Sequence, residues 1–435
     1  MGRSLPRQLL RLSDASVHGR RCVFLRLCLA LITAACQPFP FYEKFSSGTP
    51  GSPSVTPSVS VEAPAARRLP PGPVLAMTLL PGTELLAAVG PIGDAETNPT
   101  WQLYRGRADS WQRLAWPEEA VPYSLYTPAT GTPIFAVPIS NALLGSGQPW
   151  GLLRSTDGGQ SWQQALRGLD DPYVMDVALS PRFTDDQTIL AVTWRRGVYF
   201  SNNAGDSWQQ LPYRRSIDPS GGANPYDLAI ALSPDFEGGT VQHPVVNGQI
   251  VASFAHGLHI WSATAPKWQT VSITVPSRLE DYDPSSASLT AGAIAFSPNF
   301  AQDHTLYLYS GYTGLFRSSD GGVTWQFVGR GLPTPVPPTR TFHLEVASAN
   351  IVCVLLVAPP EEIEPPMFSY LPSRQRSLYC THDGGASWRV LQPPLEVGEV
   401  SAFITRREED GNIVLYLGGA QGGVFEYSIE ALTWQ

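Results

Sequence analysis

The chain has 435 residues, a formal net charge of −8, 39 glycines and 41 prolines. Charged residues make up 15% and hydrophobic residues 43%, which is typical of a turn-rich globular all-β protein. The negative net charge argues against general electrostatic attraction to nucleic acid, so we expect no nucleic-acid partner.

The N-terminal segment has the pattern of a secretion signal. A basic stretch with five arginines precedes the apolar run 22–35, which is interrupted by Arg26. The run is shorter than the roughly 20 residues that span a bilayer. We therefore expect residues 1–36 to direct export.

The end of this signal resembles a bacterial lipobox, because Ala34 and Ala35 stand directly before Cys36. Thr33 departs from that motif, which usually has leucine there. The resemblance implies acylation at Cys36 and a place on the outer face of the bacterial cytoplasmic membrane or on the cell surface. A non-lipidated secreted protein and an uncleaved short anchor are the alternatives. Residues 37–72 are rich in Ser, Thr, Pro and Gly, and we expect a disordered tether there.

Four octads repeat one pattern of hydroxyl, any residue, Asp or Asn, any residue, Gly, any residue, hydroxyl and Trp. Each lies between two strand-like runs, and its glycine-rich tip predicts a hairpin turn. The Asp or Asn and the hydroxyls can bond turn amides, so we interpret them as structural rather than catalytic. The residues concerned are Ser155, Asp157, Gly159, Trp162, Ser201, Asn203, Gly205, Trp208, Ser318, Asp320, Gly322, Trp325, Thr381, Asp383, Gly385 and Trp388.

Three degenerate copies keep the incoming strand and the tryptophan, at Trp111, Trp268 and Trp434. The seven tryptophans recur at intervals between 46 residues (162 to 208) and 63 residues (325 to 388). Two more apolar runs precede each octad. In three repeats, the first of these runs is followed by the motif Ser-Pro-x-Phe. This periodicity predicts an all-β, seven-bladed β-propeller over residues 73–435, with four antiparallel strands per blade and the octads between third and fourth strands.

The end of the repeat series bears on how the ring closes. Little sequence follows Trp434, so we expect blade seven to have a truncated outer strand or to borrow a strand from residues before Pro73. Cys353 and Cys380 fall on neighbouring predicted strands of blade six. Export permits a disulfide between them, and buried free thiols are the alternative.

Four long insertions, 214–224, 275–290, 329–341 and 359–376, fall on the face opposite the octads. Long loops in a compact fold are usually functional or disordered. We expect them to form a binding rim, with solvated surface loops as the alternative. The rim candidates are Arg214, Arg215, Arg278, Glu280, Asp281, Asp283, Arg340, Glu361, Glu364, Arg374 and Arg376.

The octads are identified as Asp-boxes, or BNR repeats, which occur in sialidases and other β-propellers. In size and repeat style the chain is similar to single-propeller bacterial proteins such as the photosystem II assembly and stability factors. That resemblance implies a protein partner, and those factors dock their client through an arginine patch. The arginine pairs at 195–196, 214–215 and 406–407 do not form a recognisable motif of that kind.

A glycoside hydrolase or lectin is the alternative reading, and it would use the same loop face. Sialidases need an arginine triad, a Tyr/Glu pair and an acid, and their usual early Arg-Ile-Pro segment is absent. The available acid pairs, such as Glu280 with Asp283, lie on one loop rather than across a sugar. The histidines lack metal-ligand spacing. We assign no catalytic residue, no metal and no cofactor, and expect an exported protein-binding scaffold, with glycan binding or a purely structural surface role as alternatives.

Overall fold

The computed structural model describes residues 69, 71–92, 100–107, 110–117, 120–139, 149–212, 228–254, 257–273, 291–311, 313–333, 343–357, 376–393 and 397–429. All of them belong to the compact unit Val55–Gln435. Within these ranges, no helix is both long and apolar enough to cross a membrane.

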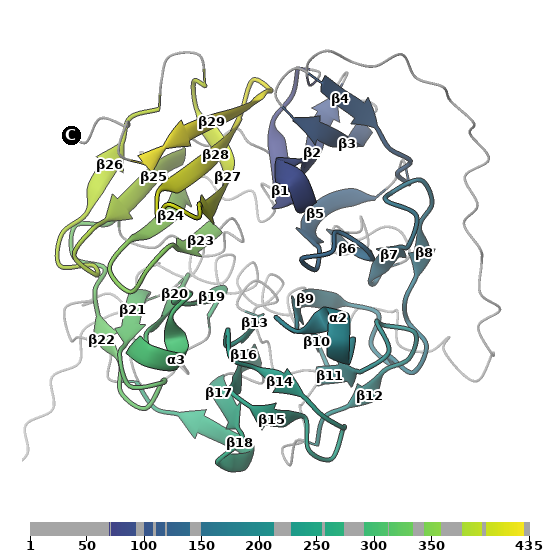
Figure 1. The fold of residues 1–435 in the computed structure, drawn as a ribbon, viewed down its shortest axis with the longest axis vertical. Coiled ribbons are helices and arrows are strands. Elements are labelled where there is room, and N and C mark those ends of the chain that lie inside the picture. The colour runs from purple at the N-terminus through teal and green to yellow at the C-terminus, as the bar shows by residue number, and fades with distance from the viewer. Residues whose placement is uncertain are drawn as a thin grey trace, which may run out of the picture. The chain divides into compact units, whose positions relative to one another are not determined.

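The first four blades are each a four-stranded antiparallel sheet made from one continuous stretch of chain (Figure 1). Blade four adds a two-stranded sheet between its first two strands. The strands are β1 (Val74–Leu79), β2 (Leu85–Ile92), β3 (Thr100–Arg107) and β4 (Ser110–Arg113); β5 (Val121–Tyr126), β6 (Ile134–Ile139), β7 (Leu153–Ser155) and β8 (Gln163–Gln164); β9 (Val174–Leu179), β10 (Ile189–Thr193), β11 (Gly197–Ser201) and β12 (Gln209–Gln210); and β13 (Ala229–Leu232), β14 (Glu237–Gly238), β15 (Val245–Asn247), β16 (Gln249–Phe254), β17 (Gly257–Ser262) and β18 (Ala265–Val271).

Blades five and six repeat the four-stranded order, and blade seven has three strands within the described residues. The strands are β19 (Ala293–Phe296), β20 (Leu306–Ser310), β21 (Gly314–Ser318) and β22 (Gln326–Phe327); β23 (His343–Val346), β24 (Val352–Val357), β25 (Arg376–Thr381) and β26 (Arg389–Leu391); and β27 (Val400–Arg407), β28 (Ile413–Gly419) and β29 (Val424–Ser428).

The predicted seven-bladed β-propeller is confirmed. The first strand of each blade lies innermost, and these seven strands contact one another in sequence around the ring, β27 touching β1 (Figure 1). Apolar clusters lie between neighbouring sheets. One of them joins Phe135 of blade two to Val177 and Tyr199 of blade three, for example. Because each sheet is covered on both faces, β10, β16 and β20 are buried at every position. This burial explains why their sequences are mostly apolar, with Gln249 and Ser253 of β16 among the buried polar exceptions.

In blade one, the connection after the first strand contains a 3-10 helix, η1 (Pro81–Thr83). In blades three and five it contains a single α-helical turn, which was not predicted from the sequence. These turns are α2 (Phe183–Asp186) and α3 (Phe300–Asp303). In each, the serine of Ser-Pro-x-Phe donates to an aspartate six residues later: Ser180 Oγ to Asp186 Oδ2 at 2.7 Å, and Ser297 Oγ to Asp303 Oδ2 at 2.6 Å. The motif therefore ends the strand and also caps a compact turn.

Blade seven closes the ring against blade one through packing and a side-chain hydrogen bond. Ser401 Oγ donates to the Val74 carbonyl oxygen at 2.8 Å. Val74 and Ala402 belong to an apolar cluster that also contains Tyr416 and, before the first strand, Leu69. Described residues before Val74 form no strand, and Trp434 lies outside the described residues. Neither predicted route of closure is therefore decided, but the seam itself is a packed interface.

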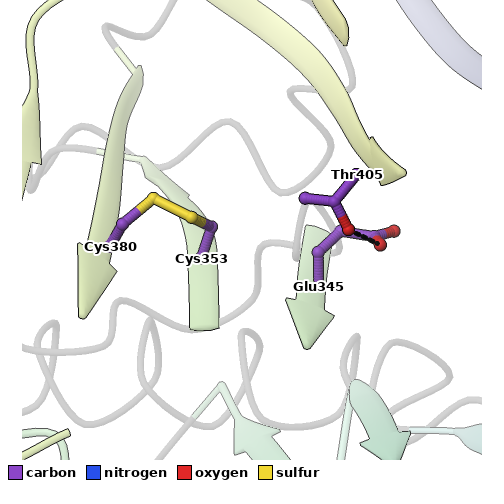
Figure 2. The surroundings of a disulfide bond; sticks show 4 residues. All are labelled: Glu345, Cys353, Cys380 and Thr405. Atoms are coloured by element: carbon purple, nitrogen blue, oxygen red, sulfur yellow. Dashed lines mark hydrogen bonds between the residues drawn. A yellow bond between two sulfur atoms is a disulfide. The ribbon is translucent and has the colours of Figure 1, made fainter. Parts of the chain in front are cut away.

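The two cysteines of blade six form a disulfide, so the alternative of free thiols is wrong. Cys353 of β24 and Cys380 of β25 are direct partners in the strand register. Glu345 of β23 is the register partner of Cys353, so all three side chains lie in one row across the sheet. Figure 2 shows the disulfide beside Glu345. Both cysteines pack into the cluster that joins blade six to blade seven.

Candidate functional site

The two faces of the propeller differ in the length of their connections. Because neighbouring strands are antiparallel, the hairpins between first and second strands and between third and fourth strands leave the sheets at one face, here called the Asp-box face. The second-to-third connections and the links between blades leave at the other, here called the linker face. The long connections 211–228, 272–292, 328–342 and 358–375 all join strand ends at the linker face.

On the Asp-box face, each octad forms a turn organised around its acid or amide. In blade two, Asp157 Oδ1 accepts hydrogen bonds from Ser155 Oγ at 2.7 Å and from the Ser161 amide at 2.9 Å. Ser161 Oγ donates to the other carboxylate oxygen at 2.5 Å. Gly159 has a φ of 93° and would place a Cβ 2.6 Å from Leu114, so only glycine fits there.

The other three octads have the same internal geometry. Asn203 replaces Asp in blade three, and its amide nitrogen donates to Ser207 Oγ at 2.8 Å. Hydrogen bonds from Ser387 and Thr381 hold the pKa of Asp383 well below its usual range. The carboxylates of the boxes are thus occupied by their own turns, which leaves them poorly suited to act as acids or bases on a substrate.

The octad tryptophans connect neighbouring blades. Trp162, Trp208 and Trp388 donate their indole N–H to carbonyl oxygens of the preceding blade or of the segment just after it, Ala115, Ala165 and Val328, at 2.7 to 2.8 Å. Trp325 instead donates to Gly322 of its own octad at 2.9 Å. These contacts add an inter-blade role that the sequence analysis did not predict.

Ten of the eleven predicted rim residues lie outside the described residues, so their arrangement stays a prediction. They are Arg214, Arg215, Arg278, Glu280, Asp281, Asp283, Arg340, Glu361, Glu364 and Arg374, and Cys36 is likewise outside. Arg376 is described, at the start of β25. Its Nη1 donates to the Ser401 carbonyl oxygen at 2.6 Å, and its amide donates to Glu399 at 2.8 Å. Arg376 therefore ties blade six to blade seven at the linker face.

The described part of the linker face carries an aromatic and arginine cluster on blade three. The Arg195 guanidinium lies 4.6 Å from the ring centre of Tyr173 and 5.2 Å from that of Trp194. The two rings pack edge to face at 5.7 Å. The Arg195 amide donates to Asp171 at 2.6 Å, which fixes the backbone, while the side chain is exposed. We call these three residues, Tyr173, Trp194 and Arg195, the blade-three patch.

A pocket of about 400 Å³ lies among the inner strands of blades six, seven, one and two. It is nearer the Asp-box face, because its lining comes from the ends of β1 and β5 and from the residues after them. The lining residues are Thr78, Leu79, Leu80, Pro81, Thr127, Pro128, Ala129, Glu345, Ile404 and Thr405. We call this space the axial pocket.

Glu345 is the one ionisable residue that lines the axial pocket. Thr405 Oγ1 donates to its Oε2 at 3.0 Å (Figure 2). Burial raises the pKa of Glu345 to about 7, although hydrogen bonds from Thr405 act in the opposite direction. Two residues away, burial and the nearby Arg376 lower the pKa of His343 to about 4, so this imidazole is neutral at physiological pH. The axial pocket thus holds an acid without a neighbouring imidazolium.

Glu345 is not among the residues predicted from the sequence, although a signal was present. The strand 343–346 reads His-Leu-Glu-Val, which places a single acid within an inner strand. Glycoside hydrolysis ordinarily requires a second carboxyl group across the substrate, and the described lining supplies one carboxyl only. The described residues also contain no group of three or more His, Cys, Asp or Glu side chains that could hold a metal ion.

No known protein family matches this chain, and no curated protein matches its sequence. Its fold resembles several solved propellers. YCF48 from Cyanidioschyzon merolae is 17% identical, with a TM-score of 0.46 over 84% of this chain and 99% of that one. YCF48 bound to D1 peptide is 17% identical, with a TM-score of 0.44 over 83% and 95%. The GH74 xyloglucanase from Xanthomonas campestris is 14% identical, with a TM-score of 0.40 over 83% and 66%.

The sheet order and the octad hairpins decide the architecture. The fold is an Asp-box β-propeller. At these identities and TM-scores, the likeness to solved structures carries no argument about what this propeller binds.

Proposed function

We propose that this propeller is an exported, lipid-anchored scaffold that binds a protein partner through its linker face. On the opposite face, the polar groups of the Asp-box hairpins are bonded within their own turns. The linker face collects the four long connections of blades three to six. That asymmetry is the observation on which the proposal rests, since binding residues concentrate on loops that a rigid scaffold positions.

The blade-three patch supports a protein as the partner. Aromatic residues and arginine are enriched at the energetic centres of protein interfaces. The Arg195 side chain is exposed and stacked on two rings, so little conformational entropy remains for it to lose on binding. The ten other predicted rim residues, without Arg376, would surround this patch as the polar rim of the interface.

The disulfide of blade six supports export. Disulfides such as Cys353–Cys380 persist in oxidising compartments and are rare in reducing ones. Together with the signal-like segment before Cys36, it favours a site of action outside the cytoplasm. Acylation at Cys36 would then place the propeller at a membrane surface, at the end of the tether 37–72.

The partner can be sought with the full chain, purified in detergent and used as bait on solubilised membranes of its own source. Arg195→Ser removes the exposed charge of the blade-three patch. Arg182→Ser is the matched control, because Arg182 is an exposed arginine of the same blade on the Asp-box face. We expect mass spectrometry to identify a protein captured by the parent and the control at least about 10-fold more than by Arg195→Ser. Equal capture by all three, or capture of nothing, would contradict the proposal, and the second outcome would direct the search to glycans.

Lipid anchoring is tested separately. Cells that express the full chain are labelled with an alkyne-tagged fatty acid, and Cys36→Ala is compared with the parent. We expect label on the parent alone, and a shift of the variant from the membrane to the soluble exported fraction. Label that persists on Cys36→Ala would overturn the anchor, whereas the partner proposal would stand.

A further inference from the structure

The axial pocket combines features that select a particular kind of ligand. Its walls include apolar groups from Leu79, Leu80 and Ile404, on blades one and seven. Glu345 of blade six contributes a carboxyl group. The pocket lies within the volume range of small-molecule sites, which runs from about 300 to 1,000 Å³.

Its hydroxyl groups are oriented by the protein itself. Thr127 Oγ1 donates to the Leu79 carbonyl oxygen at 2.8 Å and lies 3.4 Å from Thr78 Oγ1. Thr405 Oγ1 donates to Glu345. Since two of these protons are already committed to protein acceptors, the oxygens of Thr127 and Thr405 can accept hydrogen bonds from a ligand.

The charge of the axial pocket is not balanced by its own walls. Lysine, arginine and histidine are absent from its lining residues, all of which are described. The Arg376 guanidinium donates to the Ser401 carbonyl oxygen at the linker face, and His343 is neutral at physiological pH. A carboxylate in such surroundings gains more from a bound cation than an exposed carboxylate does.

We propose that the axial pocket binds a primary ammonium group carried on an aliphatic stem. The ammonium would pair with Glu345 and donate to the threonine oxygens, while the stem would contact Leu79, Leu80 and Ile404. Such a group belongs either to a free alkylamine or to a lysine side chain of a bound peptide. This site is separate from the proposed partner interface, since the axial pocket is nearer the Asp-box face.

The test is calorimetric titration of the full chain in detergent with n-hexylamine and with 1-hexanol, at about pH 8. Both probes have the same stem, but only the amine is a cation. We expect hexylamine to bind at least about 10-fold more tightly than hexanol. Equal affinities, or no binding of hexylamine, would overturn the proposal, and this comparison needs no variant to fold.

Glu345→Gln then removes the charge with little change of shape, and Glu426→Gln is the matched control on the exposed side of β29. We expect hexylamine affinity to fall at least about 10-fold in Glu345→Gln and to be unchanged in Glu426→Gln. Unchanged affinity in Glu345→Gln, with a native circular dichroism spectrum, would refute the site. Titration with Nα-acetyl-lysine methylamide identifies the source: tighter binding than hexylamine indicates a peptide lysine, and weaker binding a free amine.

Discussion

Blades three and four hold their outer strands in two different ways. In blade three, β12 has two residues and the octad turn precedes it. In blade four, the octad is degenerate and β18 has seven residues, paired along β17 from Leu258↔Val271 to Ser262↔Ala265. In blade three, where octad side chains organise the turn, two paired residues are enough to hold the outer strand. In blade four, where they do not, the outer strand is held by a longer ladder of backbone pairs with β17.

The tryptophans of these blades differ in the same way. Trp208 of blade three is 3% exposed and donates to Ala165 of blade two. Trp268 of blade four is only partly buried and packs on Phe254 and Trp261 of its own sheet, at 5.0 and 5.5 Å. Its indole nitrogen has no hydrogen-bond partner among the described residues. The octad therefore joins blades, whereas the long ladder joins strands within one blade.

The largest effect should come from removing an octad tryptophan. We expect Trp208→Ala to lower the free energy of unfolding by about 3–5 kcal/mol, because a buried indole and an inter-blade hydrogen bond are lost. Trp268→Ala, measured in parallel by urea denaturation, should cost less. If the two variants are equally destabilised, the distinction between the blades is wrong.

The disulfide of blade six adds a covalent link to a blade that also has an intact octad. Replacing Cys353 and Cys380 together by serine opens a loop with a sequence separation of 27 residues. Loop-closure entropy predicts a loss of about 3.5 kcal/mol. Thermal unfolding of the oxidised parent, the reduced parent and the double variant measures it. Reduction of the double variant should have no further effect, and any further loss would indicate another redox-sensitive site.

The octad acid should contribute less to the free energy of unfolding, and its contribution can be measured separately in blade two. Asp157→Ala leaves Ser155, Ser161 and two turn amides without their acceptor, and by analogy with helix caps we expect a loss of about 1 kcal/mol. Asp157→Asn should be nearly neutral, since Asn203 performs the same role in blade three. A cost for Asn equal to that for Ala would show that charge, rather than turn geometry, matters.

The smallest effect concerns acid stability. Hydrogen bonds from hydroxyls and amides outweigh burial and lower the pKa values of Asp157 and Asp320, and they also lower that of Asp383. A folded-state pKa below the unfolded value gives stability that is present above the unfolded pKa and is lost as pH falls through the folded one. Replacing all three by Asn should therefore reduce the loss of unfolding free energy between about pH 4 and pH 2, by about 0.3 kcal/mol per box. The effect is small because the carboxylates are exposed to solvent. An unchanged acid profile would contradict this.

The features that could be predicted from the sequence are those set by residues close together in the chain. An octad carries its turn chemistry within eight residues, so four copies and their spacing were enough to predict blades, strand order and the face of each hairpin. The degenerate octad of blade four did not reveal that β18 would lengthen, nor that β14 and β15 would form an extra sheet. These outcomes depend on neighbouring strands rather than on the segment itself.

Glu345 shows why the axial pocket was harder to find. Its neighbours Thr78, Thr127 and Thr405 are 60 to 267 residues away in the chain (405 − 345 and 345 − 78) and meet only when the ring closes. Thr78 and Thr405 lie on inner strands and Thr127 directly follows one, and none of them belongs to a motif. The long, charged insertions can be recognised in the sequence as candidate binding loops, whereas the axial pocket has a single acid and no motif.

The packed seam between blades seven and one has a consequence for how such a ring could evolve. Every sheet comes from one uninterrupted stretch of chain, and inner strands of neighbouring blades are joined by side-chain hydrogen bonds, from Ser401 to the Val74 carbonyl oxygen and from Thr405 to the Glu345 carboxyl group. Among the described residues, no strand is lent from one repeat to another. Duplication or deletion of one coding unit among blades one to six would therefore add or remove a whole four-stranded sheet and leave the ladders of its neighbours intact.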